Sequence, residues 1–347
     1  MKNGKNLSFL VIGLGSVGKR HLRNLAALGI ENIRVLRREN RRPDEKDLPP
    51  FKIETDLKAA LAKCPDAVII ASPTSLHLQQ AMAAAEAGCH ILMEKPIAHT
   101  MDGLNDLLKL VKQKGIIFQT AFQFRFHPVL QEIKTLLKQG AIGKILSAHV
   151  HWGEYLPLWH PWEDYRQSYS ARADLGGGVV LTLCHPFDYL RWLIGEIISL
   201  SAMIDKISDL EIDTEDTAAI IVRFATGTIG SIYLDYNERP PQHTLTIIGH
   251  RGKICWDNRE SAATLFAGDG HQSYRIEPPS GFERNDMFKA ELKHFIECIQ
   301  NQQQPVCNLK DGMAALEMAL AIKKSATEKR ELSLAMQYYG IHFGGKI

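Results

Sequence analysis

Apolar and polar positions alternate in a regular way over the first third of the chain. Five short apolar runs rich in β-branched residues predict strands at residues 9–12, 33–36, 67–71, 90–93 and 116–120. Apolar residues at helical spacing between these runs predict helices at residues 17–28, 57–63, 76–87 and 101–114. Thr55 and Asp56 are both available to cap the second helix. Strands and helices in this order indicate an α/β domain with a parallel sheet over residues 1–122.

The pattern changes after residue 122. The predicted strands of the second part lie at residues 145–152, 218–224 and 228–236, and its predicted helices at residues 128–138, 285–300 and 311–325. Turn signals at residues 225–227 and 250–252 indicate hairpins. We therefore predict an α+β domain with an open, mainly antiparallel sheet over residues 123–347. Its last helix has room to pack back on the first domain, and the bare sheet face favours a homodimer or homotetramer.

Composition narrows the function classes. A chain of 347 residues is long enough for about two domains of roughly 150 residues each. Lys and Arg together number 41 against 39 Asp and Glu, so overall charge gives no reason to expect nucleic acid as a partner. The cysteines are scattered, which predicts reduced thiols and no metal site, at Cys64, Cys89, Cys184, Cys255, Cys298 and Cys307.

The N-terminal segment imitates a signal peptide, because basic residues precede an apolar run at residues 7–17. Glycines interrupt that run, and Arg20 and His21 follow it without a small-residue cleavage site. No stretch of 18 or more apolar residues, the length a membrane span requires, occurs along the chain. The sequence therefore predicts a cytoplasmic protein without a membrane partner.

A glycine-rich turn directly follows the first predicted strand and opens a helix. It reads Gly13-Leu14-Gly15-Ser16-Val17-Gly18. In this context the first glycine permits a tight turn, the second lets the backbone approach a pyrophosphate, and the third lets helix and strand pack closely. The helix N-terminus adds N–H donors and a positive dipole. The segment predicts a dinucleotide site, against a purely structural turn as the alternative.

Cofactor preference depends on the end of the second strand, where folds that prefer NAD carry an acidic residue. Here Arg37 and Arg38 occupy that place, and guanidinium groups bind a 2′-phosphate that a carboxylate repels. The sequence therefore favours NADP(H). NAD remains open, because the arginines belong to a basic loop and Glu39 is close enough to serve instead.

Chemistry is expected at the carboxyl end of the fourth strand, where Glu94-Lys95-Pro96 follows an apolar run. Together with further motifs this segment resembles the Gfo/Idh/MocA oxidoreductases, a family that includes glucose-fructose oxidoreductase and inositol dehydrogenase. The motifs are Ser72-Pro73-Thr74-Ser75 with His77, Phe122-Gln123-Phe124-Arg125-Phe126 with Pro128, Gly176-Gly177-Gly178, and His185-Pro186-Phe187-Asp188. The resemblance covers essentially the whole chain and implies a Rossmann domain followed by an open antiparallel sheet.

The resemblance also implies roles for single residues. It places Lys95 and His185 against the nicotinamide and the reacting hydroxyl. It also places the cofactor among the glycine-rich turn, Arg37, Arg38, Ser72, Pro73, Thr74, His77, Glu94, Lys95 and Gln123. Histidine, with an ordinary pKa near 6.5, accepts or returns the hydroxyl proton. A charged Lys95 stabilises the alkoxide, although a desolvated neutral lysine exchanges roles with the histidine. The alternatives are a surface lysine and a core histidine.

The sequence departs from the family at one position near this histidine. Relatives commonly carry an aspartate shortly before it, and the best matching residue here is Thr182. Threonine forms hydrogen bonds but cannot hold an imidazolium by charge. Asp188, three residues after His185 and expected on the same helix face, is a candidate replacement.

Sugar contact is predicted for the aromatic and polar segment at residues 159–166, because flat sugar faces stack on rings. An ordered interface loop is the alternative. The expected substrate residues are Lys95, Arg125, Trp162, Tyr165, Arg166, Thr182, His185 and Asp188. Arg166 or Arg172 is suited to grip a carboxylate or phosphate. The region of residues 152–188 also resembles family members of surface-sugar or nucleotide-sugar pathways.

The leading interpretation is an enzyme that moves a hydride between a nicotinamide cofactor and a hydroxyl or keto carbon of a sugar, polyol or nucleotide-sugar. A rival is a non-catalytic NADP(H)-binding sensor or regulatory protein of the same fold, to which the threonine at position 182 points. A third interpretation is a transferase or epimerase-like cycle with a tightly held cofactor.

Overall fold

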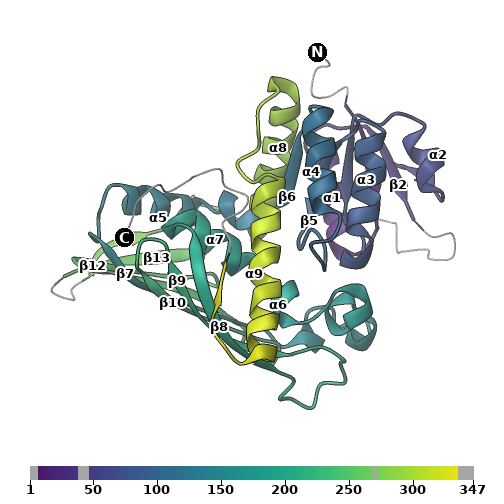
Figure 1. Ribbon diagram of the computed structural model, residues 1–347. Coiled ribbons are helices and arrows are strands. Elements are labelled where there is room, and N and C mark those ends of the chain that lie inside the picture. The colour runs from purple at the N-terminus through teal and green to yellow at the C-terminus, as the bar shows by residue number, and fades with distance from the viewer. Residues whose placement is uncertain (1–6, 38–46, 269–271, 335–347) are drawn as a thin grey trace.

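A six-stranded parallel sheet forms the first half of the computed structural model, which describes residues 7–37, 47–268 and 272–334 (Figure 1). Its strand order is β3-β2-β1-β4-β5-β6. The strands are β1 (Ser8–Ile12), β2 (Asn32–Leu36), β3 (Lys52–Glu54), β4 (Ala67–Ile70), β5 (His90–Glu94) and β6 (Phe118–Ala121). The five predicted strands are confirmed. The sequence did not indicate β3, because it is a three-residue edge strand with two exposed residues.

Helices cover both faces of this sheet. They are α1 (Ser16–Ala27), α2 (Leu57–Leu61), α3 (His77–Glu86), α4 (Leu104–Gln113) and, from the far end of the chain, α8 (Arg284–Asn301). Asp56 caps α2 by accepting from the Ala59 N–H at 2.7 Å. Leu292 and Phe295 of α8 belong to the same buried cluster as Phe9 of β1. The parallel sheet therefore depends on a helix that follows strands β7 (Ile145–Gly153) to β14 (Gln272–Ile276) of the second sheet in the chain.

The second sheet has nine strands, in the order β14-β13-β12-β11-β7-β10-β9-β8-β15. These are β7 (Ile145–Gly153), β8 (Ile197–Asp205), β9 (Thr217–Phe224), β10 (Ile229–Asp235), β11 (Gln242–Gly249), β12 (Gly252–Asp257), β13 (Ala262–Ala267), β14 (Gln272–Ile276) and β15 (Leu332–Ser333). Only β7 and β10 pair in parallel, so the predicted mainly antiparallel sheet is confirmed. The hairpin predicted at residues 250–252 is confirmed as the β11–β12 turn. The sequence did not give the range of β11, because two of its four buried positions are His243 and Gly249 rather than apolar residues.

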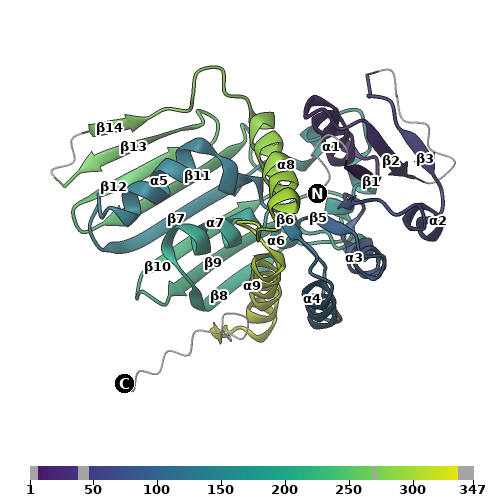
Figure 2. The same cartoon turned by 90° about the horizontal axis from the view of Figure 1, so that it is seen from above.

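One face of the nine-stranded sheet lies under α5 (Pro128–Lys138), α7 (His185–Ile194) and α9 (Leu309–Glu328), as Figure 2 shows. The helix α9 connects the two halves. Near its start, the Cα of Gly312 lies so close to β6 that a Cβ there would be 2.6 Å from Thr120 Oγ1. Near its end, Ser325 Oγ accepts from the Ala202 N–H of β8 at 3.1 Å. Because α9 contacts a strand of each sheet, it fixes the orientation of one sheet relative to the other.

The opposite face of the nine-stranded sheet carries large apolar side chains that none of the described helices covers. Met203 is 80% exposed, Ile221 54% and Tyr233 39%. These residues lie on β8, β9 and β10, which are neighbours in the sheet. Among the described residues, no helix is both long enough and apolar enough to cross a membrane.

Candidate active site

The glycine-rich turn has the shape that a dinucleotide requires. Gly13 has a φ of +95°, and a Cβ there would be 2.5 Å from the Ala71 carbonyl oxygen. A Cβ on Gly18 would be 2.1 Å from the Gly13 carbonyl oxygen, so helix and turn pack together only without a side chain. At Gly15 no heavy atom of the described residues, apart from Gly15 and its two chain neighbours, lies within 4 Å of the corresponding position. Because α1 also begins without a side-chain cap, its first N–H groups and the space above Gly15 suit a pyrophosphate.

The end of β4 is tied to the Lys95 loop by His77. Its Nε2 lies 2.8 Å from the Ser72 carbonyl oxygen and its Nδ1 lies 2.8 Å from the Pro96 carbonyl oxygen. Burial lowers the pKa of His77, so the ring is neutral and donates to one carbonyl at a time. Pro73 and Thr74 begin the short turn between these carbonyls, and Ser72 donates to Gln80 Oε1 at 2.6 Å. This segment therefore has a fixed position beside the glycine-rich turn.

Glu94 has a partner that sequence reasoning missed. The Nε2 of His21, one turn into α1 after Gly18, lies 2.7 Å from Glu94 Oε1. Burial would raise the pKa of Glu94, but the bond to His21 and the charges around it outweigh burial and lower the pKa. The carboxylate is thus ionised and links the phosphate-binding helix to the strand end that carries Lys95. The signal was available, because a histidine three residues after the last glycine points to the same side of α1.

Lys95 extends from the first half of the molecule to the second. Its Nζ donates to the carbonyl oxygen of Thr182 at 2.7 Å, at the end of α6 (Val179–Thr182). Burial would lower the pKa of Lys95, but the acidic groups of Tyr169, Cys184 and Glu94 outweigh burial and raise it. The side chain is therefore an ammonium at neutral pH. Thr182 accepts the hydrogen bond of Lys95 through its backbone carbonyl, a contact that the chemistry of a threonine side chain did not predict.

His185 is the first residue of α7 and is 3% exposed. Its Nε2 lies 3.3 Å from Gln123 Nε2, and its ring lies among Phe122, Phe124 and Trp152 at centroid distances of 5.5, 5.1 and 5.6 Å. Burial, followed by the positive charge of Lys95, lowers the pKa of His185 well below its ordinary value. The imidazole is neutral at neutral pH, and its Nδ1 has no hydrogen-bond partner among the described residues.

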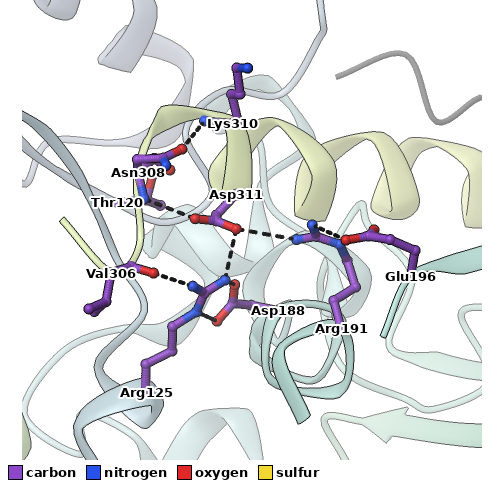
Figure 3. Close-up of polar contacts among 9 residues, drawn as sticks. All are labelled: Thr120, Arg125, Asp188, Arg191, Glu196, Val306, Asn308, Lys310 and Asp311. Atoms are coloured by element: carbon purple, nitrogen blue, oxygen red, sulfur yellow. Dashed lines mark hydrogen bonds and ion pairs between the residues drawn. The ribbon is translucent and has the colours of Figure 1, made fainter. Parts of the chain in front are cut away.

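Two of the expected substrate residues bind each other instead (Figure 3). Arg125 donates to both carboxylate oxygens of Asp188, from Nε at 2.9 Å and from a terminal nitrogen at 2.6 Å. The same terminal nitrogen lies 3.0 Å from Asp311 Oδ1 of α9, and the other one donates to the Val306 carbonyl oxygen. The predicted role of Asp188 as a charged partner of His185 stays a prediction, since the described contacts pair its carboxylate with Arg125. Arg125 is buried in the same network, and its predicted contact with the substrate also stays a prediction.

The aromatic segment at residues 159–166 lies farther out than expected for a sugar site. Trp162 is 75% exposed, and Arg166 forms ion pairs with Asp164 and Glu211 at 2.8 Å each. The Tyr165 hydroxyl accepts from the Glu211 N–H at 3.2 Å. These contacts hold the segment against a neighbouring loop, and none of them involves Lys95 or His185.

The other expected residues are an exposed arginine, Arg172, and the arginines that follow β2. Arg172 is paired with Asp174 at 2.6 Å, and both are exposed. Arg37 directly follows β2, and its N–H donates to the Glu54 carbonyl oxygen at 3.0 Å. Arg38 and Glu39 lie outside the described residues.

A buried aromatic cluster surrounds His185 and was not indicated by the sequence. We use this name for Phe124, His127, Trp152, His185, Tyr189, His243 and Trp256. His243 stacks on Trp152 with centroids 4.1 Å apart and planes 4° apart, and its Nε2 lies 3.2 Å from the Tyr189 hydroxyl. Phe124 lies edge-on to five of the other rings in the cluster. Trp152 and His243 are partners in the β7–β11 register, a pairing that links positions far apart in the chain.

One group of potential metal ligands lies elsewhere. His151, Asp235 and Glu238 bring ligand atoms within 4.8 Å of one another at the ends of β7 and β10. His151 Nε2 is 2.7 Å from Glu238 Oε2 and 3.6 Å from Asp235 Oδ2. Because neighbouring residues of a strand point to opposite faces, His151 faces away from Trp152 and the aromatic cluster. The three side chains lie in close contact on the outer face of the sheet.

Comparison with known proteins identifies the arrangement. Residues 7–122 match an oxidoreductase family with an NAD-binding Rossmann fold, and residues 130–255 match the Gfo/Idh/MocA C-terminal domain. The chain belongs to the Gfo/Idh/MocA family. As a Gfo/Idh/MocA protein it is an oxidoreductase that binds a nicotinamide dinucleotide, which confirms the predicted fold and enzyme class.

Several Gfo/Idh/MocA relatives align over nearly the whole chain. The myo-inositol 2-dehydrogenase of Thermotoga maritima is 28% identical over 93% of this chain and 97% of its own. A levoglucosan dehydrogenase in complex with NADH and L-sorbose shares the fold with a TM-score of 0.85 and 23% identity, covering 95% of this chain and 99% of its own. The WlbA dehydrogenase of Bordetella pertussis, in complex with NADH and UDP-GlcNAcA, has a TM-score of 0.79 and 22% identity over the same shares. Relatives named as dehydrogenases support the oxidoreductase interpretation and not the non-catalytic sensor.

Proposed function

We propose that this Gfo/Idh/MocA protein moves a hydride between a nicotinamide cofactor and the hydroxyl or keto carbon of a sugar, polyol or nucleotide-sugar. The observation that carries the proposal is the Lys95 ammonium, which extends from β5 to the Thr182 carbonyl, three residues before His185. The charge of this ammonium also acts on the neutral imidazole of His185, so that a cation and a proton acceptor from different halves of the molecule lie near each other. The names of the relatives, inositol, levoglucosan and UDP-GlcNAcA enzymes or complexes, support a hydroxylated substrate.

The bound cofactor supplies or accepts the hydride, and the chain's own residues handle the proton. In alcohol oxidation, His185 takes the hydroxyl proton, which its low pKa allows because the ring is uncharged at neutral pH. A Gln123 amide that donates to Nε2 marks Nε2 as the nitrogen that carries no hydrogen, and we assign proton transfer to this atom, with the substrate hydroxyl displacing the amide from it. Lys95 stabilises the negative charge that develops on the substrate oxygen. In the reverse direction the same two groups return the proton.

The substrate is proposed to lie against Lys95, Thr182 and His185. Trp162, Tyr165 and Arg166 contribute to this site only if the outer segment closes further on binding. For the cofactor we favour NADP(H), with Arg37 and Arg38 holding the 2′-phosphate. A variant with both arginines changed to Ala should lose NADPH affinity much more than NADH affinity. Equal losses would remove the assignment.

The proposal is tested by a screen of sugars, polyols and nucleotide-sugars with NADH and NADPH, followed by absorbance at the reduced nicotinamide. Turnover that disappears in Lys95→Met and His185→Ala, and persists in a surface lysine variant, supports it. Wild-type protein that binds a dinucleotide but turns over no member of the screen contradicts it. Mass analysis of the substrates after incubation detects a cycle with no net change in the cofactor.

We further propose a division into domains after residue 122 and a homodimer or homotetramer formed by the outer sheet face. Met203, Ile221 and Tyr233 give this face the exposed apolar area that such contacts bury. Replacing Ile221 with Glu should shift the sedimentation of the assembly toward the monomer. We assign the protein to the cytoplasm, since all six cysteines are free thiols.

A further inference from the structure

One residue of the second half touches the glycine-rich turn of the first. His160 lies in the segment between β7 and α6, and its Nε2 is 3.5 Å from Ser16 Oγ. Ser16 is the first residue of α1, directly after the open position at Gly15. The imidazole therefore lies next to the place where a Rossmann fold holds the pyrophosphate of its dinucleotide.

Only one of the two ring nitrogens of His160 has a polar contact among the described residues. Its Nδ1 is covered and has no hydrogen-bond partner in the part of the chain that the structure describes. Its ring packs against Trp162 with centroids 5.3 Å apart, which limits how the imidazole can turn. When Nε2 carries the ring proton, the imidazole has an N–H to donate. The N-terminus of α1, where a phosphate binds in this fold, lies beside that nitrogen.

The segment that carries His160 is anchored on both sides of this contact. On the near side, Trp159 packs edge-on against Tyr236 with centroids 5.4 Å apart. On the far side, the Cα of Gly176 approaches Thr74 so closely that a Cβ there would be 3.1 Å from its Cβ. Thr74 belongs to the loop after β4, beside the glycine-rich turn. The segment is thus held against the end of β10 by Trp159, and it approaches the glycine-rich turn and its neighbouring loop at His160 and Gly176.

We propose that His160 binds the pyrophosphate of the dinucleotide and that residues 156–178 close over the cofactor as a clasp from the second domain. This inference rests on the proposed cofactor binding and adds a residue that the glycine motif does not contain. The ring donates an N–H to a phosphate oxygen in place of its contact with Ser16. The cofactor is then held between the helix N-terminus below and the imidazole above.

The test measures cofactor affinity rather than turnover. Binding of NADH and NADPH is titrated by their fluorescence in wild type, His160→Phe and His160→Gln. Phe keeps the ring volume but removes the donor, and the loss of one hydrogen bond to a charged group predicts a dissociation constant about tenfold higher. Gln keeps an N–H donor and should remain within about threefold of wild type. His149→Gln, on the outer face of β7 and bonded to Ser231, is the matched control and should not change affinity.

A second ligand locates the contact along the cofactor. ADP-ribose, or its 2′-phosphate form if NADPH is preferred, carries the pyrophosphate without the nicotinamide and is measured by displacement. The proposal requires the same fold loss for ADP-ribose as for the full cofactor in His160→Phe. It is overturned if His160→Phe binds as wild type does, if Phe and Gln lose equally, or if ADP-ribose affinity is unchanged. Wild-type protein that binds neither dinucleotide overturns the proposed function as well, which separates the two failures.

Discussion

Two sets of buried polar residues lie beside each other along α7, the ion-pair network of Figure 3 and the aromatic cluster. They differ in whether their polar atoms have partners. In the network of Figure 3, Arg125 lies between Asp188 and Asp311, and Arg191 lies between Asp311 and Glu196. In the aromatic cluster, His185, His243 and Trp256 each keep a ring nitrogen without a hydrogen-bond partner among the described residues. Buried polar atoms are normally paired, so those that are not need a reason. The first group stabilises the packing of α7 against α9, whereas the second keeps polar atoms whose reason we seek in the chemistry of His185.

One helix serves both groups. His185 begins α7, and Asp188 follows one turn later on the same helix. Arg191 of the same helix pairs with Glu196 at 2.9 Å and lies 3.8 Å from Asp311. The paired network therefore fixes α7 against α9 and, through α7, fixes where the imidazole lies. A substitution in the network should act on stability, whereas one beside His185 should act on chemistry.

The largest expected effect is on turnover in Lys95→Met, which keeps the length of the side chain but removes its charge. We expect the turnover number to fall about 10³-fold, the typical loss when a donor to a developing oxyanion is removed. The free energy of unfolding should change by no more than about 1 kcal/mol, because Lys95 makes one hydrogen bond in the structure. The measurements are reduced-nicotinamide absorbance and urea unfolding. Lys109→Met, at an exposed ion pair with Asp106, should leave both unchanged.

Arg125→Met is expected to lower the free energy of unfolding, the quantity that Lys95→Met leaves nearly unchanged. Removal of this guanidinium leaves Asp188 and Asp311 without their shared partner in the protein interior, which should cost about 3–5 kcal/mol in unfolding free energy. The double variant Arg125→Met with Asp188→Leu should recover part of the loss, because one stranded carboxylate is gone. Urea unfolding of both variants provides the measurement. Equal stability of the single and double variants would contradict the role given to this ion pair.

These contrasts show which parts of the site a sequence can reveal. Gly13, Gly18 and Lys95 were predictable, because backbone geometry demands glycine at two of these positions and the end of a parallel strand is a site for chemistry. The partner of Asp188 was not, because its spacing from His185 indicates a shared helix face whereas Arg125 comes from another element. The stacking of Trp152 on His243 could not be predicted either, because it depends on the register of two strands that are distant in the chain.

The aromatic cluster should also make stability depend on pH. Burial lowers the pKa of His127 to about 4 from an ordinary value of 6.5, so below pH 6.5 the unfolded chain binds a proton that the folded chain does not. Stability is therefore lost as the pH falls from 6.5 toward 4. The loss from His127 alone reaches roughly 3 kcal/mol at the lower end, at 1.36 kcal/mol per pKa unit. Urea unfolding between pH 7.5 and 4.5 should show this decline.

A matched variant isolates the histidine in that measurement. His127 accepts from the Val129 N–H at 3.2 Å and so caps α5, a role that Asn fills without titrating. His127→Asn should therefore have a shallower decline than wild type, by up to one proton between pH 6.5 and 4. Parallel curves would mean that His127 is not the titrating group.

The smallest effect is expected from Gln123→Leu. This variant tests whether the surroundings of His185 in the aromatic cluster set the pKa that its chemistry needs. The Gln123 amide lies 3.3 Å from His185 Nε2, and a donor to this atom favours the neutral ring. Its removal should reduce kcat/KM about tenfold and raise the pKa of His185 toward its ordinary value, which moves the acidic limb of the pH profile upward. Gln113→Leu, exposed at the end of α4, is the control. A uniform loss at every pH would make Gln123 a packing residue, whereas a displaced limb makes it a positioning residue that acts through the imidazole.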